Sequence, residues 1–299
     1  MKKLKLLVFF CIVSTLSLSP PLVAQTTGEP SEQAVPETDA GPPSADLSRA
    51  NELVRAQKYA EAEEILAELQ DRYPEDTDLL TMRGELLIAL SQPREAVEVL
   101  RTAARLEPQR PRLQFQLGSA LAATGEVEAA IEAFGEELKN NDDPQVLVLA
   151  RLNRSFLYQQ RGAPADGAKE LEAVVELEPG RAPVYGDLVA LYLELRRTDD
   201  AADVLSRGEA NGFESASHAY SIAARFGKDG NYERAVDLFT RSLEIDPNSA
   251  DAERSLAAAL EQLGREEEAA KHLRRYLELN PDDPDAEAIA AKIRAIEEG

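Results

Sequence analysis

Apolar and small residues recur along this chain of 299 residues with a period of about 34 residues. Pro74 and Pro108 lie 34 residues apart, and so do Pro247 and Pro281. In each period a small residue lies twelve positions before the proline, and large apolar residues lie eight and twenty-one positions before it. A recurrence of this length, with apolar steps of three and four residues, predicts stacked pairs of helices. Because one pair cannot bury its own apolar face, neighbouring pairs are expected to share a continuous core.

Seven units fit this frame. The small position is occupied by Ala62, Ala96, Ala130, Gly167, Ala201, Ala235 and Ala269. The large residues eight positions before the proline position are Leu66, Leu100, Phe134, Leu171, Leu205, Phe239 and Leu273. Those twenty-one positions before it are Leu53, Leu87, Leu121, Tyr158, Tyr192, Phe226 and Leu260. A small residue on one helix lets a large residue of another approach closely, so these positions are predicted to form the core.

Glycines mark the turn between the two helices in four units. They are Gly125, Gly162, Gly230 and Gly264, and a left-handed glycine is expected to end each first helix. The prolines begin the turn into the next unit, because proline is not tolerated in a helix interior. Departures are visible: about three extra residues precede Pro144, and the third and fifth units have Asp142 and Phe213 at the proline position.

These residues resemble the tetratricopeptide repeat family. The segment GNYERAVDLFTRSLEIDPN (Gly230–Asn248) is similar to the second helix of that repeat, and LQFQLGSALAATGEVEAAIEAF (Leu113–Phe134) is similar to both helices and their turn. LNRSFLYQQRG (Leu152–Gly162) is similar to a first-helix variant. The resemblance covers roughly residues 45–281. It implies an all-α fold, a right-handed helical-repeat solenoid of about seven helix–turn–helix units plus a C-terminal capping helix.

Three further segments complete the expected organisation around the array at residues 45–281. Residues 1–24 are predicted to be a secretory signal, because lysines precede a short apolar run and Ala24 is suited to cleavage. Retention of this segment as an inner-membrane anchor is the alternative, although its apolar run is short for a span. Residues 25–44 are predicted to be a disordered tether rich in Pro, Glu, Ser and Thr. Residues 282–299 are predicted to form a helix that caps the array.

Charge limits the partners that this chain can bind. The formal net charge is −22, from 55 acidic and 33 basic residues. Such an acidic surface repels nucleic acid and anionic lipid, and it favours a protein or peptide partner with basic character. Membrane association is expected only through residues 1–24, if they are retained. The signal points to a periplasmic or extracellular location.

Residues suited to catalysis are scarce. His218 and His272 lie in different units, and the sequence has no cysteine cluster or paired-histidine motif that would bind a transition metal. No glycine-rich phosphate loop is present either. We therefore expect no enzymatic activity, no metal site and no cofactor.

The resemblance implies that a ligand binds on the inner, concave face formed by the first helices. The residues predicted there are Arg112, Phe115, Gln116, Asn153, Phe156, Gln160 and Tyr220. Aromatic rings and amides suit an extended peptide, because rings supply contact area and amides pair with a peptide backbone. The alternative is that Phe115 and Phe156 only pack between units.

A non-enzymatic scaffold for protein–protein interaction in the cell envelope or periplasm is therefore the predicted function. Two alternatives remain at this point. One is a structural homo-oligomer that docks through the ends of the array. The other is an accessory subunit of an envelope enzyme or export complex.

Overall fold

The computed structural model describes residues 42–298, which form fifteen α-helices, and no strand occurs in this part of the chain. The helices fall into two compact units, of which unit 1 ends at Ala150 and unit 2 begins at Arg151. The division lies within α8 (Pro144–Gln160). The predicted signal, residues 1–24, and the predicted tether up to residue 41 lie outside the described residues.

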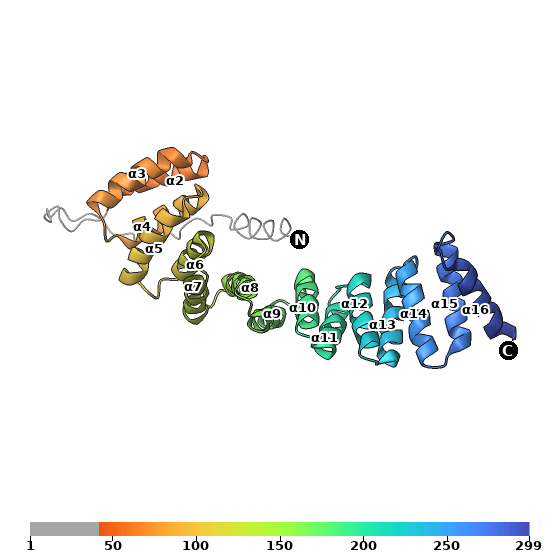
Figure 1. Ribbon diagram of the computed structural model, residues 1–299. Helices are drawn as coiled ribbons and strands as arrows, with labels where there is room; N and C mark the ends of the chain where they lie inside the picture. Colours follow the sequence, from red (N-terminus) through yellow and green to blue (C-terminus); the bar gives the residue numbers. More distant parts are fainter. Residues whose placement is uncertain (1–41, 299) are drawn as a thin grey trace, which may run out of the picture. The chain divides into compact units, whose positions relative to one another are not determined.

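Unit 1 contains three helix pairs and the start of α8 (Figure 1). In each pair two successive helices pack against each other. The pairs are α2 (Ser44–Arg55) with α3 (Tyr59–Arg72), α4 (Thr77–Ala89) with α5 (Pro93–Leu106), and α6 (Leu113–Thr124) with α7 (Val127–Asn140).

Unit 2 contains the rest of α8 followed by eight helices (Figure 1). They are α9 (Pro164–Leu177), α10 (Ala182–Glu194), α11 (Thr198–Ala210), α12 (Ala216–Lys228), α13 (Tyr232–Ile245), α14 (Ala250–Gln262), α15 (Glu266–Leu279) and α16 (Ala286–Glu298). With α8 and α9 counted as a pair, the described residues form seven helix pairs and a terminal helix. The predicted all-α helical-repeat fold is confirmed.

The repeated small and large residues form the core, as predicted. All six alanines at the small position are fully buried, with 0% exposure, and Gly167 is buried as well. The seven large residues eight positions before the proline position are also buried, from 0% exposed for Leu66 to 6% for Leu273. Among the residues twenty-one positions before it, five are buried and two, Leu53 and Tyr158, are half-buried.

Close helix contact explains two further glycines that the repeat frame did not single out. A Cβ atom at Gly84 would overlap the side chain of Leu100, and one at Gly118 would lie 3.1 Å from the ring of Phe134. These glycines therefore let the second helix of a pair lie directly on the first. An alanine at Gly84 would require Leu100 to move.

Left-handed residues end the first helices, but only some of them are glycine. Gly125, Gly162, Gly230 and Gly264 have φ between 71° and 84°, as predicted. The first, second and fifth pairs instead use Gln57, Ser91 and Arg196, with φ of 59°, 59° and 58°. A side chain in this conformation is strained, because its Cβ approaches the following carbonyl oxygen.

The fifth pair shows how the array tolerates the absence of a proline. The ring of Phe213 stacks on Tyr185, with centroids 6.1 Å apart, and lies 5.6 Å from the ring of His218. Gly208 provides the space, because a Cβ there would lie 2.9 Å from the Phe213 ring. The Tyr185 hydroxyl donates a hydrogen bond to the carbonyl oxygen of Pro179 at 2.8 Å. Packing of the Phe213 ring against Tyr185 and His218 thus takes the place of the proline at this turn.

Candidate binding surfaces

The first helices of neighbouring pairs form one side of each unit, which we call the first-helix face. In unit 1 it includes α4 and α6, which contact each other. In unit 2 it includes α8, α10, α12 and α14, and α12 contacts both α10 and α14. The seven residues predicted to bind a ligand are divided between these two faces. Arg112, Phe115 and Gln116 belong to unit 1, and Asn153, Phe156, Gln160 and Tyr220 belong to unit 2.

Phe115 is a core residue and does not offer its ring to a ligand. The residue is 4% exposed, and its ring meets that of Phe134 edge to face with centroids 5.3 Å apart. Phe134 belongs to the second helix of the same pair. The expectation of a binding role for this ring is therefore corrected in favour of packing, although the packing lies within one pair rather than between units.

Arg112 is held by its backbone at the start of α6. It has a left-handed φ of 68°, and its N–H donates to the Glu137 carboxylate at 2.8 Å. The same carboxylate accepts from the N–H of Phe115 at 3.0 Å and from the Asn141 amide at 2.5 Å. Glu137 is 1% exposed. This buried side chain of α7 satisfies the free N–H groups at the start of α6, where no side-chain cap is present.

Polar side chains connect α4 and α6 across the first-helix face of unit 1. The Gln116 amide donates to the Glu85 carboxylate, and Arg110 pairs with Asp78. Desolvation raises the pKa of Glu85, although the charge of Arg112, the hydrogen bond from Gln116 and the charge of Arg110 lower it. Asp78 and Glu85 were not among the residues predicted from the sequence. Their separations from their partners, 32 and 31 residues, are close to the repeat period and could have revealed them.

On the first-helix face of unit 2, the predicted residues differ in how far they reach solvent. Asn153 is 7% exposed and so is largely a buried polar residue. Phe156 is half-buried, and Gln160 is exposed. The ring of Tyr220 is half-buried and lies 5.4 Å from that of Phe239, while its hydroxyl is 3.3 Å from the Ser255 hydroxyl. Phe156, Gln160 and Tyr220 thus keep part of their surface exposed to solvent.

A histidine and a carboxylate add to the first-helix face of unit 2. The Nδ1 atom of His218 lies 2.7 Å from the Ser215 hydroxyl. Gly186 leaves room for the imidazole, because a Cβ atom at position 186 would lie 3.2 Å from the ring. Desolvation lowers the pKa of His218, and the charge of Asp187 opposes this shift. Desolvation likewise raises the pKa of Asp187, and His218 opposes it. The lowered pKa keeps the His218 imidazole neutral at neutral pH.

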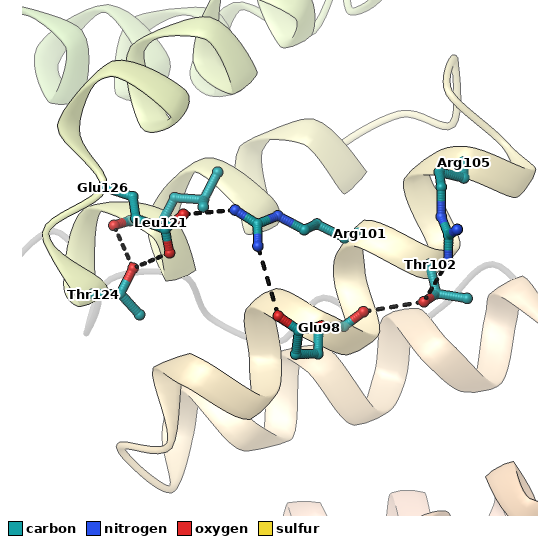
Figure 2. Close-up of polar contacts among 7 residues, drawn as sticks. All are labelled: Glu98, Arg101, Thr102, Arg105, Leu121, Thr124 and Glu126. Atoms are coloured by element: carbon teal, nitrogen blue, oxygen red, sulfur yellow. Dashed lines mark hydrogen bonds and ion pairs between the residues drawn. The ribbon is translucent and has the colours of Figure 1, made fainter.

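A network of polar contacts links α5 to the segment between α6 and α7 in unit 1 (Figure 2). Arg101 of α5 binds Glu126 at 2.6 Å and Glu98 at 3.6 Å. The Thr124 hydroxyl lies 3.0 Å from the Glu126 carboxylate and donates to the Leu121 carbonyl oxygen at 2.9 Å. Hydrogen bonds from Thr124 and Arg101 lower the pKa of Glu126. This network joins α5 to the turn before α7 and stabilises the stacking of neighbouring pairs rather than forming a binding surface.

The described residues contain neither a metal-binding cluster nor a helix that could span a membrane. Across residues 42–298, no three His, Cys, Asp or Glu side chains lie close enough together to hold a metal ion. In the same part of the chain, no helix is both long and apolar enough to cross a membrane.

Comparison with known proteins identifies the family. The tetratricopeptide repeat family matches residues 47–91, 81–144, 158–226 and 228–293. The chain therefore belongs to the tetratricopeptide repeat family, as the sequence predicted. Proteins of this family generally mediate protein–protein interactions.

Three curated proteins are similar to the chain over about two thirds of its length. It is 28% identical over 213 residues to human mitochondrial import receptor subunit TOM70, covering 66% of this chain and 34% of that protein. It is 26% identical over 227 residues to the TPR repeat-containing protein YpiA of Bacillus subtilis strain 168, covering 72% and 50%. It is 26% identical over 203 residues to cellulose synthase operon protein C of Pseudomonas fluorescens, covering 64% and 16%. The chain thus spans at most half the length of these relatives.

Solved structures support the same fold. The Naa15/Naa10 complex bound to HypK-THB contains a chain with a TM-score of 0.62 and 17% identity, covering 85% of this chain and 39% of that one. The C-terminal part of a TPR repeat-containing protein from Cytophaga hutchinsonii gives a TM-score of 0.54 and 15% identity, covering 81% and 98%. At these identities the likeness concerns the fold.

Proposed function

We propose that the chain is a non-enzymatic scaffold that binds a segment of a partner protein on the first-helix face of unit 2. Membership of a family that mediates protein–protein interactions supports this proposal. The observation that carries it is the presence of Phe156, Gln160 and Tyr220 on α8 and α12, with their side chains half-buried or exposed. Partly exposed rings supply contact area, and amide and hydroxyl groups can bond to a peptide backbone.

We also propose an acidic scaffold that selects a basic partner and works outside the cytoplasm. The net charge of −22 supports a basic partner. The lysine-rich start, the apolar run and Ala24 of residues 1–24 support export, and similarity to a cellulose synthase operon protein is compatible with an envelope setting. Cell fractionation tests the location: full-length chain in the cytoplasm would contradict export, and residues 1–24 retained in the membrane fraction would indicate an anchor.

The binding proposal is tested by substitution once cross-linking in an envelope fraction has identified a partner. Phe156→Ala and Tyr220→Ala should each weaken that partner's affinity about tenfold, which corresponds to about 1.4 kcal/mol, with little change in melting temperature. Tyr232→Ala is the matched control, because Tyr232 is a half-buried ring on the second helix α13. Loss of stability with unchanged affinity would show that Phe156 and Tyr220 serve packing and would refute this binding face.

A further inference from the structure

A hollow lies in unit 2 where α13, α14 and α15 meet. Its volume is about 650 Å³, which is within the usual range for ligand pockets. Its apolar lining residues are Val236, Leu243 and Leu256. Val236 and Leu256 are buried, at 7% and 1% exposure. The hollow thus has an apolar lining on which a long side chain can lie.

Acidic groups outnumber basic ones around this hollow. The lining includes four carboxylates, namely Asp237, Glu244, Glu253 and Glu268, against Arg265 and His272. Arg265 is occupied by Glu268, to which it makes two hydrogen bonds of 2.7 Å. These bonds lower the pKa of Glu268, so its carboxylate remains charged at neutral pH.

Two further cations lie near the hollow, and neither reverses this balance. Arg241 is shared among the carboxylates of Glu209 at 2.8 Å, Glu244 at 3.0 Å and Glu214 at 3.5 Å. Lys271 is exposed to solvent, where water and salt screen its charge. The potential inside the hollow therefore favours a cation.

The base of the hollow carries a buried carboxylate–imidazole pair. Glu253 is 7% exposed, and its Oε2 atom lies 2.6 Å from Nδ1 of His272. The imidazole directs Nδ1 at Glu253, and the carboxylate oxygens of the lining are hydrogen-bond acceptors. With the Thr240 hydroxyl, the lining is rich in acceptors, which suits a ligand group that donates several hydrogen bonds.

We propose that this hollow binds an arginine or lysine side chain from a basic segment of a partner protein. A long cationic side chain can lay its methylene groups on the half-buried Leu243 and the edge of Val236 while its charged end reaches the carboxylates. A second copy of this chain is a poor occupant, because two chains of net charge −22 repel each other. The lining of this site shares no residue with the binding face of the proposed function, so either proposal can fail alone.

The test measures binding of a short two-arginine peptide to the full chain by fluorescence anisotropy. The same peptide with neutral citrulline in place of arginine is the ligand control. The arginine peptide should bind at low salt and lose affinity as salt rises, and the citrulline peptide should bind at least about tenfold more weakly, as expected for lost charge-assisted hydrogen bonds. Equal binding of the two peptides would overturn the proposal.

Matched variants separate this hollow from the general acidity of the chain. Asp237→Asn with Glu244→Gln should weaken the peptide about tenfold, because two exposed rim charges are removed. Glu128→Gln with Glu132→Gln removes the same charge from exposed positions of α7 and should change affinity less than about twofold. An equal loss of affinity in the two double variants would show that peptide binding depends only on the net charge of the chain, and would refute the site.

Two further measurements locate the bound peptide. Thr240→Arg places a cation at an exposed position in the lining and should abolish binding while melting temperature is kept. In methyl NMR spectra of the full chain, the peptide should shift Val236 and Leu256 resonances, and Tyr220→Ala should leave this binding unchanged. Shifts confined to the first-helix face would mean that the peptide binds there, and the hollow would be excluded as the site.

Discussion

At the scale of single residues, three turns hold a side chain where the backbone favours glycine. Gln57, Ser91 and Arg196 all have φ near 59° and are exposed to solvent. Replacing each with glycine should raise the free energy of unfolding by roughly 0.5–1 kcal/mol, because relief of left-handed strain exceeds the entropic cost of glycine.

Urea unfolding of each variant measures this effect. Gly264→Ala is the matched control, because it introduces a side chain at a turn with φ of 71° and should lower stability by about 1 kcal/mol. If Ser91→Gly or Arg196→Gly lowers the unfolding midpoint, the side chain contributes more to the turn than its backbone strain costs.

Residues could be predicted from the sequence where the repeat frame constrains them. The alanines, the four turn glycines and all the large apolar residues except the half-buried Leu53 and Tyr158 lie as predicted, because each repeat has the same packing and the same turn conformation. Phe115 was not, because its burial depends on the ring of Phe134, which lies close to Gly118. The contact between Gln116 and Glu85 depends on the orientation of two long polar side chains. The repeat period alone does not predict that orientation.

At the scale of helices, the small position controls how closely two helices approach. Ala235 of α13 is fully buried. Ala235→Leu should destabilise the chain by roughly 1–3 kcal/mol, because the added atoms have no free volume at this helix contact. Ala130→Leu in α7 should do the same within unit 1.

Thermal unfolding of these variants tests whether the repeat frame is energetically meaningful. Ala258→Leu is the control, because Ala258 is exposed on α14 and should change stability by less than about 0.5 kcal/mol. If all three substitutions have the same small effect, the residue at the small position does not control how closely the helices approach.

The helices themselves were predictable from seven repeats of one pattern. The start of α8 at Pro144 and its 17 residues follow the extra residues seen before that proline.

At the scale of the whole molecule, ion pairs between neighbouring repeats act against a large excess of negative charge. Arg207 and Glu172 lie 35 residues apart in sequence and meet at 2.9 Å, and Arg241 meets Glu209 across 32 residues. Both pairs are at least partly exposed to solvent, and such pairs contribute only about 0.2–1 kcal/mol each. The net charge of −22 instead acts on every part of the chain.

Screening should therefore stabilise this protein. We expect the melting temperature to rise between about 10 mM and 200 mM NaCl, because this increase shortens the range of repulsion from about 30 Å to less than about 10 Å. A variant with Glu128, Glu132 and Glu287 changed to Gln removes three exposed carboxylates. It should melt higher than the parent at low salt and gain less from added salt. A melting temperature that falls with salt in both proteins would show that the ion pairs between repeats outweigh the repulsion, and the acidic surface would then stabilise the fold through its pairing with arginine.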